Sequence, residues 1–134
     1  MAKIHHRLSR VPAWLFTILT LALIFWLTLS PKPFGDEEIP LFPGADKIAH
    51  ALMFGFLTAM MLLDHQRKRS WRRSPARHAA IAAAVSSLIG IGIGFAQKWM
   101  NQGRGFEVAD MAADTLGASL VAFIWLLVQD RWRP

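Results

Sequence analysis

Long apolar stretches alternate with shorter charged segments along the whole chain. Residues 11–30 and 79–97 contain no charged side chain, and residues 48–63 and 115–129 are similarly apolar but shorter. A membrane span needs about 20 mostly apolar residues, so the two shorter stretches are long enough only if their helices begin at the acidic residues before them. The pattern predicts one domain, residues 1–134, that is an all-α, four-span transmembrane helical bundle with spans at about 11–30, 46–63, 79–98 and 110–129.

Lysine and arginine are unevenly distributed among the segments that flank these spans. Of the 15 Lys and Arg residues, 11 lie before the first span, in residues 64–78 or after residue 129, and four lie in the other two connections. Because cytoplasmic segments carry the excess of Lys and Arg, both termini and residues 64–78 are predicted to be cytoplasmic. Such a basic segment faces anionic headgroups, so we expect membrane lipids and no nucleic acid as partners.

Composition excludes several kinds of site. The chain has no cysteine, which excludes disulfide bonds, thiolate metal ligands, a cysteine nucleophile and lipidation of a cysteine. Charged residues make up 18% of the chain, below the roughly one quarter of soluble domains, as expected for a membrane protein. Neither a Gly-rich phosphate loop nor a nucleophile elbow occurs, and the sequence predicts no cofactor.

Small residues recur every four positions in three of the predicted spans, and this spacing lets helix backbones approach in lipid. They are Ala51, Gly55 and Ala59 in the second span, Ser86, Gly90 and Gly94 in the third, and Ala113 and Gly117 in the fourth. We interpret the glycine run of the third span as close packing, with a locally flexible helix as the alternative. The first span is bulky throughout, so we expect it at the periphery.

Polar residues at the ends of the spans are the candidate site. Asp46 and His50 lie four residues apart, and so do Asp110 and Asp114, so each pair shares one helix face. Gln97 ends the third span, and Arg104 precedes the fourth. The charge distribution places all of them on the non-cytoplasmic side, where ionisable groups in spans are functional candidates. We expect them to converge in one polar layer, with Asp114 one turn deeper than Asp110.

Other interpretations of the same residues stay open. Asp46 and Asp110 are suited to cap their helices, and a paired polar layer can hold a bundle together without any ligand. A metal site made of Asp46, His50, Asp110 and Asp114 is a weaker alternative, since these N and O ligands suit zinc, manganese or iron.

The spaced motifs resemble the VanZ-like family of small bacterial membrane proteins. That family opens one span with D-K-x-x-H-x-x-x-F, ends the next with E-x-x-Q, and opens the last with G-R-x-x-x-x-x-D-x-x-x-N-x-x-G. The matching residues are Asp46, Lys47, His50, Phe54, Gln97, Gly103, Arg104, Asp110 and Gly117. Two positions depart from the pattern, because Gly94 stands where the family has Glu and Asp114 where it has Asn.

The resemblance implies a multi-pass protein of the bacterial cytoplasmic (inner) membrane. Some members are associated with low-level resistance to teicoplanin, a glycopeptide that acts at the outer face of the membrane. No established reaction comes with the resemblance, so the function rests on the polar residues themselves.

Three functions compete on these residues. The first is binding of an envelope lipid, a lipid-linked envelope precursor or a glycopeptide-type amphiphile by the set Asp46, Lys47, His50, Gln97, Arg104, Asp110 and Asp114. The second is an intramembrane enzyme acting on such a lipid, with His50 as general acid/base positioned by Asp46 and by the pair Asp110 and Asp114. The third is a structural assembly protein. Because the sequence identifies neither a nucleophile nor a metal for an enzyme, it favours the first.

The predicted orientation is testable because the chain has no native cysteine. Single cysteines replacing Ser74 and Gly35 are expected to behave oppositely in intact cells, with only Gly35→Cys labelled by an impermeant thiol reagent. Labelling at position 74 but not at position 35 would show that the orientation is the reverse of the predicted one.

Overall fold

The computed structural model describes Arg7, Arg10, Pro12 and residues 14–29, 45–100 and 108–131, with side chains for all of these except Ala45, Asp46 and Met100. The described segments form four α-helices and one short 3-10 helix, and no strand occurs among them. They are α2 (Leu15–Leu29), α3 (Ala45–Lys68), α4 (Ala76–Met100), α5 (Val108–Val128) and η1 (Gln129–Arg131). The prediction of an all-helical fold is confirmed.

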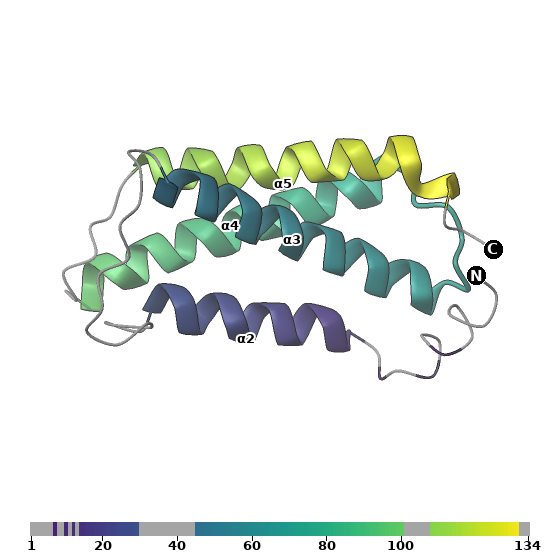
Figure 1. The fold of residues 1–134 in the computed structure, drawn as a ribbon, viewed down its shortest axis with the longest axis horizontal. Helices are drawn as coiled ribbons and strands as arrows, with labels where there is room; N and C mark the ends of the chain where they lie inside the picture. Colours follow the sequence, from purple (N-terminus) through teal and green to yellow (C-terminus); the bar gives the residue numbers. More distant parts are fainter. Residues whose placement is uncertain are drawn as a thin grey trace.

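Consecutive helices run in alternate directions along one long axis (Figure 1). The start of α2, the end of α3, the start of α4 and the end of α5 lie at one end of the bundle. The starts of α3 and α5 lie at the other end (Figure 1). Among the described residues, α3, α4 and α5 pack on one another, whereas α2 lies against α3 and α4 but not against α5. The bulky first span therefore lies at the edge of the bundle.

Three of the helices are long and apolar enough to cross a membrane, over Lys47–Lys68, Ala76–Trp99 and Val108–Arg131. The described part of α2 has 15 residues, which at 1.5 Å per residue is about 22 Å, short of a hydrocarbon core of about 30 Å. Large apolar side chains point outward from every helix, as expected for helices that face lipid. Examples are Ile18, Leu52, Leu88, Leu116 and Leu127, each more than half exposed.

The closest helix contact joins α3 and α5 through the small residues. A Cβ atom added to Gly117 would lie 2.1 Å from the carbonyl oxygen of Ala51, so only glycine lets the two backbones meet there. One turn further along α3, a Cβ on Gly55 would lie 2.8 Å from Cγ2 of Val121. Backbone approach through small residues is the means by which helices associate tightly in lipid.

The α4 contact with α3 is partly polar. The buried Thr58 hydroxyl donates to the buried Ser86 hydroxyl at 2.9 Å, besides contacting the carbonyl of Phe54 in its own helix. The glycines of α4 differ from one another: Gly90 faces α5 closely, whereas no atom of the described residues lies within 4 Å of a Cβ added to Gly92. Close packing therefore accounts for Gly90 but not for Gly92.

The connection expected over residues 64–78 is shorter than the charge pattern predicts. Because α3 continues to Lys68 and α4 begins at Ala76, the segment 64–68 is helical, and Asp64 and Arg67 are buried. Nη2 of Arg67 donates to Oδ1 of Asp64 at 2.6 Å, and Oδ2 accepts from the backbone N and the hydroxyl of Thr17 at 2.8 Å. Asp64 thus satisfies a donor at the start of α2, where backbone N–H groups lack helical partners.

A second buried polar contact closes the same end of the bundle. The amide oxygen of Gln129 accepts from Nε2 of Gln66 at 2.8 Å and from the backbone N of Ser74 at 2.7 Å. Ser74 is only 1% exposed, so a cysteine there would be shielded from reagent on either side of the membrane. The exposed Arg72 is the better reporter for the orientation experiment.

The two glycines Gly117 and Gly92 provide a matched test of this packing. We expect Gly117→Ala to lower the free energy of unfolding by about 1–3 kcal/mol, because the added methyl group meets the Ala51 backbone. Gly92→Ala meets open space and raises helix propensity, so it should leave stability unchanged or increase it by up to about 1 kcal/mol. Thermal unfolding in detergent micelles measures both. Equal stability of the two variants would contradict the close α3–α5 contact.

Candidate functional site

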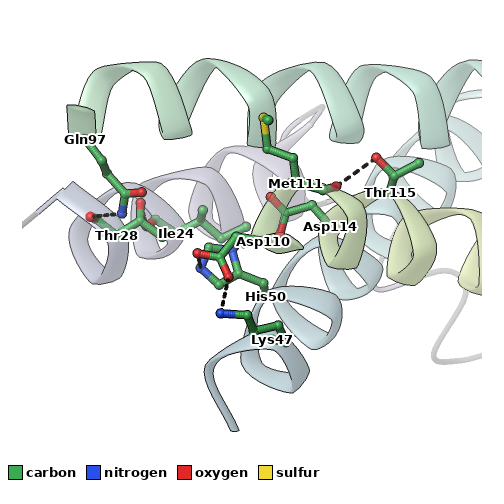
Figure 2. Close-up of polar contacts among 9 residues, drawn as sticks. All are labelled: Ile24, Thr28, Lys47, His50, Gln97, Asp110, Met111, Asp114 and Thr115. Carbon is green, nitrogen blue, oxygen red and sulfur yellow. Dashed lines mark hydrogen bonds and ion pairs between the residues drawn. The ribbon is translucent and has the colours of Figure 1, made fainter. Parts of the chain in front are cut away.

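Four ionisable side chains meet where α3 and α5 begin, and we call them the α3–α5 cluster: Lys47, His50, Asp110 and Asp114 (Figure 2). Nδ1 of His50 lies 2.9 Å from Oδ1 of Asp114, a hydrogen-bond distance. Nζ of Lys47 lies 3.3 Å from Oδ1 of Asp110. Nε2 of His50 lies 3.7 Å from Oδ2 of Asp110, longer than a hydrogen bond.

Helix geometry explains why these four side chains share one place. Lys47 and His50 are three residues apart on α3, and Asp110 and Asp114 are four apart on α5, so each pair lies on one helix face. His50 directly precedes Ala51, whose carbonyl touches Gly117, and Asp114 lies one turn before Gly117. The close backbone contact therefore brings the two faces within hydrogen-bond range.

Exposure increases across the cluster from the bundle interior to its end. The side chain of Asp114 is 2% exposed, those of His50 and Asp110 are 15% and 16%, and that of Lys47 is 33%. The carboxylate of Asp114 is thus buried, the imidazole of His50 is partly exposed, and the side chain of Lys47 is the most accessible of the three. A solute or headgroup arriving at this end would meet Lys47 before the others.

Helix α4 contributes room rather than a polar group. A Cβ added to Gly90 would lie 2.5 Å from Oδ2 of Asp114, so glycine at this position makes the space that the carboxylate occupies. On the other side, the ring of His50 stacks on the buried ring of Phe54, with an interplanar angle of 8° and centroids 6.4 Å apart. Both neighbours restrict the orientation of the His50–Asp114 pair.

Gln97 has a different role from the one its position suggests. Its side chain is buried, and Nε2 donates to the backbone carbonyl of Thr28 at 2.7 Å, so it links α4 to the last turn of α2 (Figure 2). Carbonyl groups in a last helical turn lack helical partners, which makes Thr28 a suitable acceptor. Gln97 thus supports α2 at the end of the bundle that holds the cluster.

Two predicted site residues lie outside what the structure describes. These are Arg104, which falls between α4 and α5, and the side chain of Asp46. The metal hypothesis includes Asp46 and so falls partly outside as well. Among the described side chains, no group of three or more His, Asp and Glu residues has a geometry that could hold a metal ion.

The arrangement is suited to hold a histidine in one orientation. An ionised carboxylate only accepts hydrogen bonds, so with Asp114 ionised the proton of the 2.9 Å contact is on Nδ1 of His50. Fixing one ring nitrogen in this way defines what the other nitrogen presents to its surroundings. Gly90 was not among the site residues predicted from the sequence, although its position in the glycine run of the third span was a signal that could have identified it.

Comparison with known proteins places the chain in a family. A family model described as VanZ/LLP1 matches residues 6–129, a range that includes all four helices and the cluster. No curated protein and no solved structure matches the chain.

The energetic link between α3 and α5 can be measured by a double-mutant cycle on His50→Ala and Asp114→Ala. We expect a coupling free energy of about 1 kcal/mol, because each substitution removes the same buried hydrogen bond. The control cycle pairs His50→Ala with Thr115→Ala. The Thr115 side chain is exposed and its hydroxyl donates to the carbonyl of Met111 in its own turn, so its coupling should stay within about 0.5 kcal/mol of zero. Equal coupling in both cycles would argue against a specific His50–Asp114 contact.

Proposed function

Because the chain belongs to the VanZ/LLP1 family, we propose that it is a multi-span membrane protein that binds a polar headgroup. The headgroup belongs either to an envelope lipid, such as a lipid-linked envelope precursor, or to a glycopeptide-type amphiphile. The proposed binding site is the α3–α5 cluster. By the distribution of Lys and Arg, this end of the bundle faces away from the cytoplasm. The proposal links the protein to teicoplanin resistance through the lipids on which such glycopeptides act.

The observation that carries the proposal is the graded exposure of the cluster. A purely structural ion pair between helices has no need of an accessible cation, yet Lys47 is one third exposed beside the half-buried His50 and Asp110. Ionisable groups at membrane depth usually pair with one another and mark ligand or ion pathways. The exposure of the side chains decreases from Lys47 to Asp114, as expected for a path that a polar headgroup enters from the end of the bundle.

The mixed charges of the cluster indicate the chemistry of the headgroup. Lys47 supplies a point charge for a phosphate oxygen, while Asp110 and Asp114, when ionised, accept hydrogen bonds and donate none. A bare phosphate would meet two carboxylates within the cluster. A headgroup with both an anionic group and hydroxyl or amide donors, as sugars and peptides carry, satisfies both kinds of partner. Arg104, which lies outside the described residues, is included in the proposal as a second cation on the basis of the sequence alone.

An apolar surface at the same end of the molecule supports the lipid character of the ligand. An open hollow of about 740 Å³ lies on α4, lined by Gly92, Phe95, Ala96, Lys98 and Trp99. Within the described part of the chain, no atom lies within 4 Å of a Cβ added to Gly92, so the glycine leaves space in the lining of this hollow. A lipid tail that lies along α4 accounts for a glycine that helix packing does not explain.

A second function is favoured by one contact. A carboxylate held 2.9 Å from Nδ1 of His50 is the arrangement that orients a histidine for general acid–base catalysis. In that case the protein would be an enzyme acting on an envelope lipid, with His50 as the acid or base and Asp114 as its positioning residue.

The test uses Lys47→Gln, with Arg72→Gln as the control. Each variant removes one positive charge, and the exposed Arg72 lies between the end of α3 and the start of α4, at the opposite end of the bundle from the proposed site. Purified protein in micelles is titrated with a polyprenyl-linked sugar–peptide precursor and followed by tryptophan fluorescence. We expect Lys47→Gln to weaken binding about tenfold, the effect of losing one charged hydrogen bond, and Arg72→Gln to bind as wild type. Equal affinity of wild type and Lys47→Gln would refute the proposed site.

The same variants, together with His50→Ala and Arg104→Ala, separate binding from catalysis in cells. Binding alone predicts that teicoplanin susceptibility changes in Lys47→Gln and Arg104→Ala while the lipid-precursor profile stays as in wild type. Catalysis predicts a precursor that accumulates in His50→Ala. Folded variants that match wild type in both assays would leave a structural role for the cluster.

A further inference from the structure

The opposite end of the bundle has a pocket that the proposed function does not use. Its volume is about 260 Å³, and its walls come from the start of α2 and from facing turns of α3 and α4. It is lined by Trp14, Met61, Leu62, His65, His78, Ile81 and Ala82. All of these are apolar except the two histidines, so the pocket combines an apolar body with one polar site.

Cationic side chains gather around the two histidines. Nε2 of His65 lies 3.1 Å from Nδ1 of His78, and Nη1 of Arg69 lies 3.3 Å from the same Nδ1 atom. Nζ of Lys68 lies 5.8 Å from the centroid of the Trp14 ring. Because the one lone pair on Nδ1 of His78 can accept from either His65 or Arg69, the three side chains form one connected group at the pocket.

The acidic residues at this end of the described structure are both engaged with other arginines. Asp64 is fully buried and pairs with Arg67, and Asp130 forms an ion pair with Arg73 on the surface. Among the described residues, no carboxylate forms an ion pair with Lys68 or Arg69 at the pocket. The local charge is positive and complements an anion at the membrane interface.

Trp14 forms one wall of the pocket in an unusual backbone conformation. Its φ angle is 62°, a left-handed conformation that bulky residues rarely adopt and that the surroundings must maintain. The indole ring lies 6.0 Å from the His65 ring, centroid to centroid. Tryptophan is enriched at the level of lipid headgroups, and this ring is held where a headgroup joins the apolar tails.

We propose that this pocket binds one anionic diacyl phospholipid of the phosphatidylglycerol type. One acyl chain lies along the apolar wall formed by Met61, Ile81 and Ala82, and the phosphate is bound by Arg69 and the His65–His78 pair. The apolar wall distinguishes a lipid from a free phosphate, which would gain nothing from it. The site lies at the opposite end from the α3–α5 cluster and does not depend on the function proposed there (Figure 1).

The first experiment measures lipid retention by the full-length protein in native mass spectrometry from detergent. Phosphatidylglycerol and phosphatidylcholine with identical acyl chains are added in equal amounts. We expect one phosphatidylglycerol to be retained in preference to phosphatidylcholine, and millimolar inorganic phosphate to displace none of it. Equal retention of the two lipids would overturn the proposal, and so would displacement by inorganic phosphate.

Charge variants locate the headgroup. Arg69→Gln and His78→Phe should each reduce phosphatidylglycerol retention about tenfold relative to wild type, because each removes a donor for the phosphate. Arg72→Gln is the matched control, since Arg72 is exposed on the same connection and makes the same change in charge. An equal loss in Arg72→Gln would show diffuse attraction to the basic segment and would refute a defined site. Since two variants probe the phosphate, a failure of one to fold leaves the other as the test.

Steric variants locate the acyl chain. Ile81 is 59% exposed and lines the pocket, so Ile81→Trp should fill the apolar wall and reduce lipid retention several-fold. Leu88→Trp is the control, because Leu88 is 66% exposed on the same helix, α4, but lies outside the pocket lining. Wild-type retention in Ile81→Trp would place the lipid elsewhere and overturn the assignment.

Discussion

The arrangement of this protein depends on one close contact, that of Gly117 in α5 with the backbone of Ala51 in α3. Burial of apolar side chains gives helices little reason to associate in lipid, so backbone proximity and interhelical hydrogen bonds have to supply the attraction. The contact also sets the spacing of the candidate site. His50 adjoins Ala51 and Asp114 lies one turn from Gly117, so the 2.9 Å hydrogen bond between them follows from the distance between the backbones.

Buried polar contacts then attach the remaining helices at both ends of the bundle. At one end, Asp64 satisfies the start of α2, and at the other, Gln97 binds the carbonyl of Thr28 near the end of α2. The short peripheral helix is thus held by polar groups near both of its ends. In membrane proteins such hydrogen bonds contribute only about 0.6 kcal/mol each on average, so they orient α2 more than they stabilise the bundle.

The two ends differ in their electrostatics, and the difference suggests a division of roles. The α3–α5 cluster contains two carboxylates with Lys47 and His50 and is suited to a headgroup with both charges and donors. The pocket beside His65 and His78 is apolar with an unneutralised cationic edge, which suits an ordinary anionic phospholipid.

The sequence by itself determined the helical class, the four apolar stretches and the pairing of residues on single helix faces, because apolar run length and helix periodicity are local properties. It also identified the cluster residues by their cost inside a membrane. Only the tertiary structure decided the partners. The i,i+4 rule assigns a face but not the helix that it meets, so the contacts of His50 with Asp114 and of Gln97 with Thr28 required the packed bundle. For the same reason the sequence placed Asp64 in a solvated connection, whereas folding buries it under α2. Gly90 and Gly92 look alike in the sequence, but an added Cβ would contact Asp114 at position 90 and no described atom at position 92.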